Sequence, residues 1–308
     1  MATLLGFALV ALVAGIPTAH ATGAQPPVVV RTDDIDRFFR VYDATHGQPS
    51  VEVLQKEYLD AGSQALQQFV VARIGSAAKL HDAILARPKD FDDARACAAA
   101  LATTRQQLPA VWSRLAALYP PAQFPPVTFV IGRSSTGGTT TIDGMVIGVE
   151  TVCRMTQMGA DLGPRFTHMI AHELAHIQQP AGRVDAPPGA TLLFQALLEG
   201  GAEFMAEAAS GEVSNVHLKT WTRGHECVIE SAFAKDAAGS DVSHWLYNGI
   251  GTPDQPGDLG YWVGYRIAKA YVAQASDKQR AIADLLNVNP GNAEAFLTRS
   301  GWSPQTGC

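Results

Sequence analysis

The chain has little charge, and the charge it has is not predominantly basic. Only 17% of its 308 residues are charged, with 23 Lys and Arg against 29 Asp and Glu, which gives a formal net charge of −6. A protein that binds nucleic acid presents a basic face to the phosphate backbone, so we expect no nucleic-acid partner. The chain is 47% hydrophobic, which is enough to bury a sizeable core.

A long hydrophobic run is also missing. The apolar stretch at residues 2–16 is shorter than the roughly 20 apolar residues that span a bilayer. A small-x-small pattern follows and ends at Ala21, which is typical of a signal-peptidase site. We therefore predict that residues 1–21 are a signal peptide and that the mature protein is periplasmic or secreted, with no stable membrane span. Because the first residues lack Lys and Arg, an uncleaved anchor is the alternative.

Cysteine is scarce. The four cysteines are Cys97, Cys153, Cys227 and Cys308. No two of them form a Cys-x-x-Cys pair, which disfavours a zinc site built from thiolates. In an exported chain an even number of cysteines permits one or two disulfides. All three pairings stay open, and so does the alternative of buried free thiols.

The order of expected elements indicates an α+β fold that is predominantly helical. Helical spacing of apolar residues covers most of 31–119, including 51–75, 76–88 and 92–120. A β-branched run at 124–132 predicts a strand, and two apolar runs around Asp143-Gly144 predict a hairpin within 133–152. Helices are expected at 164–178 and 190–211, and in the remainder, including 244–249 and 259–275. We therefore divide the chain into an N-terminal helical region, 31–119, and a second domain, 120–308.

The stretch AHELAH (171–176) places two imidazoles and a carboxylate in an otherwise apolar run. On a helix, His172 and His176 lie on one face, close enough for both rings to reach one ion. Glu173 lies about 100° further round the same helix, so it can stand beside the ion without binding it. In catalytic zinc sites such a carboxylate takes the proton from a zinc-bound water during attack on a carbonyl. We therefore predict a Zn²⁺ site in which Glu173 activates the water.

A catalytic zinc needs a third protein ligand. The metzincin pattern would place glycine at 179 and histidine at 182, but the sequence has Gln179 and Gly182. His168 precedes His172 by one turn, and three ligands at successive turns of one helix would drift round its axis. We therefore expect His168 behind the ligands or at the surface.

The segment LLEGGAEFMAE (197–207) supplies the better candidate. Glu199 follows a run of apolar residues, so we expect it to enter the interior as the third ligand. Glu203, one turn later, could accept the other ring N–H of a ligating histidine, and it is the second candidate for the third ligand. Gly200 and Gly201 each destabilise a helix by about 1 kcal/mol relative to alanine. Close packing against the 164–178 helix would explain why glycine occupies both positions. The alternative is a solvated face formed by Glu199, Glu203 and Glu207.

These motifs resemble those of the gluzincin metallopeptidases. HELAH followed by Glu-Gly-x-Ala-Glu at 199–203 is similar to the motif pair of gluzincin aminopeptidases, in which the glutamate before glycine is the third zinc ligand. The resemblance implies a zincin-like core, and it implies that Glu203 orients a ligand, as in thermolysin-like enzymes. The chain lacks the Gly-x-Met-Glu-Asn segment of the aminopeptidases, which puts exopeptidase action in doubt.

A closer resemblance is to an uncharacterised bacterial group of predicted zinc-dependent proteases. It rests on HELAHIQQP (172–180), the Glu-Gly-x-Ala-Glu segment, GYWVGYRIAKAY (260–271) and the glycine-rich segment 130–150, and it covers roughly residues 120–275. By this resemblance the hairpin would bind an extended substrate along its edge. Gluzincins often use a Tyr or His as the donor to the oxyanion, and Tyr265 and Tyr261 are the candidates here.

We therefore expect an exported zinc metallopeptidase that hydrolyses peptide bonds of peptide or protein substrates. His172, His176 and Glu199 would hold the zinc, and Glu173 with Tyr265 or Tyr261 would act on the substrate. Two alternatives stay open. One is a zinc hydrolase with a non-peptide substrate, and the other is a non-catalytic zinc-binding protein of the cell envelope.

Overall fold

The computed structural model describes residues 27–180, 186–211, 216–249, 251–252 and 254–305. The predicted signal peptide and Cys308 lie outside these residues. Among the described residues, no helix is long and apolar enough to cross a membrane.

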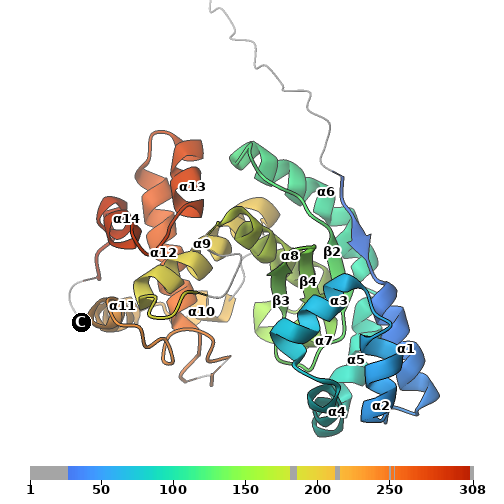
Figure 1. Cartoon of the computed structure of the whole chain (residues 1–308). Coiled ribbons are helices and arrows are strands. Elements are labelled where there is room, and N and C mark those ends of the chain that lie inside the picture. Colours follow the sequence, from blue (N-terminus) through green and yellow to red (C-terminus); the bar gives the residue numbers. More distant parts are fainter. Residues whose placement is uncertain (1–26, 181–185, 212–215, 250, 253, 306–308) are drawn as a thin grey trace, which may run out of the picture.

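Helices dominate the chain, and four short strands form one sheet (Figure 1). Before the second strand lie α1 (Asp33–Ala44), α2 (Val51–Val53), the π-helical turn η1 (Leu54–Leu59), α3 (Gln64–Phe69), the π-helical turn η2 (Val70–Ile74), α4 (Ala77–Ala86), α5 (Pro88–Ala98) and α6 (Leu101–Leu118). After the sheet come α7 (Val149–Arg154), the 3₁₀ turn η3 (Thr156–Met158), α8 (Leu162–Gln178), α9 (Leu192–Ser210), α10 (Val216–Trp221), α11 (Glu226–Asp236), α12 (Leu259–Gln274), α13 (Lys278–Leu286) and α14 (Ala293–Ser300). The predominantly helical α+β prediction is confirmed.

The sheet has the order β1-β2-β4-β3, with strands β1 (Val30–Arg31), β2 (Val127–Val130), β3 (Gly138–Thr141) and β4 (Gly144–Gly148). β1 and β4 both run parallel to β2, whereas β3 runs antiparallel to β4. Every residue of β2 and β4 is buried, because helices cover both faces of the centre of the sheet. The predicted hairpin is therefore present, and β3 is its strand at the edge of the sheet.

Two sequence-based expectations about helices need correction. The expected helix at 51–75 is interrupted after Leu59, and a new helix begins where the Ser63 hydroxyl accepts a hydrogen bond from the backbone N–H of Leu66 at 3.1 Å. The expected helix at 244–249 is wrong, because this segment forms turns with Tyr247 at a φ of 59°. Asn248 and Gly249, a pair typical of turns, carried the signal against a helix.

Helix α9 lies between α8 and α12, and its ends have the expected chemistry. The Thr191 side chain accepts a hydrogen bond from the backbone N–H of Phe194 at 3.3 Å, and Gly211 ends the helix in a left-handed conformation with a φ of 81°. Gly200 does not pack against α8 as expected. A Cβ atom there would overlap the backbone of Gly264 and Tyr265 in α12.

The N-terminal helices share one hydrophobic core with the rest of the chain. A disulfide between Cys97 of α5 and Cys153 of α7, with Cα atoms 6.1 Å apart, links the N-terminal helical region to the segment that follows β4. Cys227 is also disulfide-bonded. The expectation of disulfides is confirmed, and that of buried free thiols is wrong for these three cysteines.

The crossing of α9 and α12 gives a first prediction. A Cβ atom added at Gly264 would overlap the Ala196 carbonyl group. A Cβ atom added at Gly163 of α8 would have Thr103 Cγ2 as its nearest neighbour, at an ordinary contact distance of 3.5 Å. We expect Gly264→Ala to lower the free energy of unfolding by about 3 kcal/mol. Gly163→Ala should leave it unchanged or raise it by up to about 1 kcal/mol. Urea denaturation of both variants measures the difference, and equal stabilities would contradict this packing.

Candidate metal centre and active site

Helix α8 carries the first two candidate metal ligands. Pro164 lies in its first turn, where the missing N–H has no helical partner. His172, Glu173 and His176 are only 7%, 6% and 9% exposed. The two imidazoles point their Nε2 atoms toward the same place, and these atoms lie 3.0 Å apart. The ring planes form an angle of 81°.

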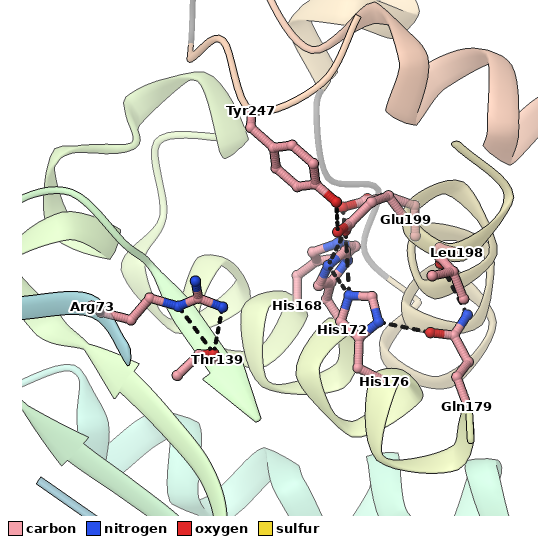
Figure 2. Close-up of polar contacts among 10 residues, drawn as sticks. Arg73, Thr139, His168, His172, His176, Gln179, Leu198, Glu199 and Tyr247 are labelled. Carbon is pink, nitrogen blue, oxygen red and sulfur yellow. Dashed lines mark hydrogen bonds and ion pairs between the residues drawn. The ribbon is translucent and has the colours of Figure 1, made fainter. Parts of the chain in front are cut away.

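Helix α9 brings Glu199 to the same point, as Figure 2 shows. Its Oε2 atom lies 3.3 Å from Nε2 of His172 and 3.3 Å from Nε2 of His176. Within the described part of the chain, these three residues form a group that could hold a metal ion. Burial opposes the ionisation of Glu199, but the neighbouring histidines outweigh it and lower the pKa of this carboxyl. Glu199 is therefore not part of a solvated helix face.

Glu203 lies behind the ligands and contacts two histidines. Its Oε1 atom is 3.0 Å from Nδ1 of His172, although the geometry of this contact is not that of a hydrogen bond, and its Oε2 is hydrogen-bonded to Nε2 of His168 at 3.2 Å. Burial opposes its ionisation, yet the two histidines hold the pKa of Glu203 at about 2. His168 is buried at 2% exposure and lies behind the candidate ligands.

Glu173 faces the sheet. A Cβ atom on Gly138 of the edge strand β3 would lie 2.6 Å from Oε1 and 2.7 Å from Cγ of Glu173. The glycine therefore makes room for this carboxylate, a use that turn chemistry alone did not suggest. Burial raises the pKa of Glu173, while His176 and His172 act to lower it.

The two tyrosines predicted from the sequence occupy different places. The Tyr261 ring stacks on His172 with centroids 6.3 Å apart, and burial raises the pKa of its phenol well above the usual value. The Tyr265 hydroxyl instead donates a hydrogen bond to Glu207 and accepts one from Lys269 Nζ at 2.8 Å. The structure therefore brings Tyr261, but not the Tyr265 hydroxyl, to the candidate ligands.

Sequence reasoning missed Tyr247. Its hydroxyl donates a hydrogen bond of 2.9 Å to Oε1 of Glu199, and its ring meets Tyr261 edge to face with centroids 6.2 Å apart. The side chain is 58% exposed, so it borders the group from the solvent side. Its backbone φ of 59° is unusual for a bulky side chain. No local signal marks this residue, because the turn that carries it lies 48 positions from Glu199 in the sequence.

Arg73, in η2, was also missed. Its Nε and Nη2 atoms lie 3.2 and 3.0 Å from the Thr139 hydroxyl oxygen on β3, and Figure 2 shows this pair across from the histidines. The positive charge of Arg73 acts to lower the pKa of Glu173. The N-terminal helical region therefore contributes a cation beside the edge strand, which helical periodicity alone could not reveal.

Comparison with known proteins gives a family. The sequence model of the family "Predicted Zn-dependent protease (DUF2268)" matches residues 134–295, a range that includes His172, Glu173, His176 and Glu199. The match covers more than half of the 308 residues. No curated protein and no solved structure matches the chain significantly. The resemblance to the uncharacterised protease group is confirmed, and the chain belongs to this family of predicted zinc-dependent proteases.

Proposed function

We propose that this chain is an exported zinc metallopeptidase of gluzincin type with a zincin-like core. The observation that carries the proposal is the meeting of His172, His176 and Glu199 beside the buried carboxylate of Glu173 and the edge strand β3. Export is supported by the sequence of residues 1–21 and by the Cys97–Cys153 disulfide, since disulfides persist in oxidising compartments.

The distances among the candidate ligand atoms fit zinc. Ligand atoms about 2.0–2.1 Å from a tetrahedral zinc ion are roughly 3.3 Å from one another. The three atoms here are separated by 3.0, 3.3 and 3.3 Å. Two imidazoles and one carboxylate are also the ligand set of known catalytic zinc sites. Zinc bound there would supply Lewis acidity and lower the pKa of a water molecule.

Glu173 would act as the base and then as the acid. Its place beside the ligands lets it take a proton from the attacking water and pass it to the leaving amine. Gly138 permits the carboxylate to approach the strand. The proposed proton-transfer group would then lie beside the strand proposed to hold the substrate.

The edge strand supports a peptide as the substrate. Among the described strands, β3 pairs only with β4, so its other edge can form main-chain hydrogen bonds with an extended chain. Such pairing would place a peptide bond of the substrate beside Gly138 and Glu173. This supports a peptide over a non-peptide substrate, and a catalytic over a purely structural use of the metal.

Tyr247 is our candidate for the donor to the oxyanion. Its hydroxyl already lies beside the candidate ligand Glu199, and it reaches the group from the solvent side, where a substrate would enter. A bulky residue held at positive φ is a strain of the kind that clusters at functional sites. We therefore propose Tyr247 for this role in place of Tyr265, and Tyr261, whose ring stacks on His172, stays as the second candidate.

Replacement of Glu173 tests the reaction. We expect the zinc-loaded protein to cleave members of a complex peptide library, and Glu173→Gln to bind zinc but leave the library intact, because the amide cannot accept the proton. Mass spectrometry of the two digests identifies the cleavage sites and shows whether they are internal or terminal. If both proteins bind zinc and neither digest shows cleavage, the peptidase proposal is contradicted, and a non-peptide substrate or a binding role is favoured.

Two matched tyrosine variants test the oxyanion donor. We expect Tyr247→Phe to lower kcat by about 10²–10³-fold, the usual loss when one such donor is removed. Tyr265→Phe should keep kcat near the wild-type value and lower the free energy of unfolding by about 1 kcal/mol, since its hydroxyl bonds to Glu207 and Lys269. Steady-state kinetics and urea denaturation measure both. A large loss of kcat in Tyr265→Phe alone would reverse the assignment.

A further inference from the structure

Gln179 stands at the end of the helix that carries both histidines. The residue before a proline is disfavoured in the helical conformation, and Pro180 follows Gln179. The backbone of Gln179 accordingly leaves the helix, with φ −92° and ψ 107°, while its N–H still donates to the His176 carbonyl oxygen at 3.1 Å. Its side chain turns inward and is 0% exposed.

Both ends of the buried amide have a partner. The Gln179 Nε2 group donates a hydrogen bond of 2.9 Å to the backbone carbonyl oxygen of Leu198 in α9, and Oε1 lies 2.7 Å from Nδ1 of His176 (Figure 2). A carbonyl oxygen can only accept a hydrogen bond. The opposite amide orientation would therefore set two acceptors against each other at Leu198. The orientation is fixed, and the amide oxygen faces the imidazole.

The amide determines which nitrogen of His176 carries the proton. Since Gln179 Oε1 accepts, Nδ1 of His176 must donate, which leaves the lone pair of the neutral ring on Nε2. That Nε2 atom is the one 3.3 Å from Oε2 of Glu199. By contrast, the Nδ1 contact of His172 with Glu203 lacks hydrogen-bond geometry. Gln179 therefore determines the tautomer of His176, whereas Nδ1 of His172 faces a carboxylate.

We propose that Gln179 is a positioning residue of the metal centre. It sets the tautomer and ring orientation of His176, and it attaches this ring to the α9 backbone at Leu198, the residue before Glu199. One side chain thereby holds a ligand of α8 and a ligand of α9 at a fixed separation. This inference rests on the metal site of the proposed function but not on the identity of the substrate.

Gly201 of α9 lies next to the amide of Gln179. A Cβ atom at position 201 would lie 3.5 Å from Nε2 of Gln179 and 3.1 Å from Cδ1 of Leu285. The 3.1 Å distance is tight, so the glycine leaves room for Leu285 of α13, whereas 3.5 Å is an ordinary contact distance to the amide. The second of the two adjacent glycines, unlike Gly200, contributes to the contact between α9 and the end of α8.

Zinc affinity of the full mature chain tests the proposal. We expect Gln179→Met, which fills a similar volume without the amide, to raise the zinc dissociation constant by about 10–100-fold, the usual effect of losing such a partner. Gln179→Glu retains an acceptor for His176 but loses the donor to Leu198, so its affinity should fall between those of the wild type and Gln179→Met. Competition with a zinc chelator measures the constants, and the absorption spectrum of the cobalt-substituted proteins reports the geometry of the site.

Gln178 provides a matched control. It is also buried at the end of α8, but its amide bonds to Gln123 and to the Leu174 carbonyl oxygen and does not touch a histidine. Gln178→Met should lower the melting temperature of the zinc-free protein while keeping the wild-type zinc affinity and cobalt spectrum. Wild-type affinity in Gln179→Met, or an equal loss in both methionine variants, would overturn the proposal. A protein whose zinc affinity depends on Gln179 but which cleaves no peptide would contradict only the proposed function.

Discussion

Helices α8 and α9 meet through buried polar groups, and these contacts restrict how the two helices can pack. Two imidazoles of α8 face two carboxylates of α9, at His172, His176, Glu199 and Glu203. An unpaired buried charge destabilises a protein by several kcal/mol, so neither helix can turn or slide without exposing or isolating these groups. The contact between α9 and α12 at Gly264 holds α9 from its other side. The positions of the candidate ligands are therefore determined by backbone packing as well as by their own contacts.

The local parts of the site could be predicted from the sequence, and the long-range parts could not. The spacing of His172 and His176 determines that they share a helix face, and the apolar run before Glu199 indicates its burial. The position of Tyr247 depends on how a turn far from the ligands folds over them, which no periodicity encodes. Gln179 had a local signal in the proline that follows it, but its partner on α9 becomes visible only in three dimensions. Which neighbouring helix approaches a glycine inside a helix, such as Gly200, likewise depends on the tertiary structure.

The N-terminal helices belong to the same architecture as the candidate site. The part of the chain before β2 contributes strand β1 to the sheet, Cys97 to the disulfide, and the cation of Arg73 beside the edge strand. This region lies outside the residues that match the family. The immediate surroundings of β3 therefore combine a part of the chain shared with the family and a part that precedes the match. Arg73 joins the two through its hydrogen bonds to Thr139.

The most direct measurement is a crystal structure of the purified mature protein, with diffraction data collected on both sides of the zinc absorption edge. The predicted result is one anomalous peak, bounded by Nε2 of His172, Nε2 of His176 and the Glu199 carboxylate, with Glu173 beside it and not bound to it. An ion at another place, a fourth protein ligand that closes the site, or no zinc in a protein purified without chelators would contradict the assignment of a catalytic zinc centre.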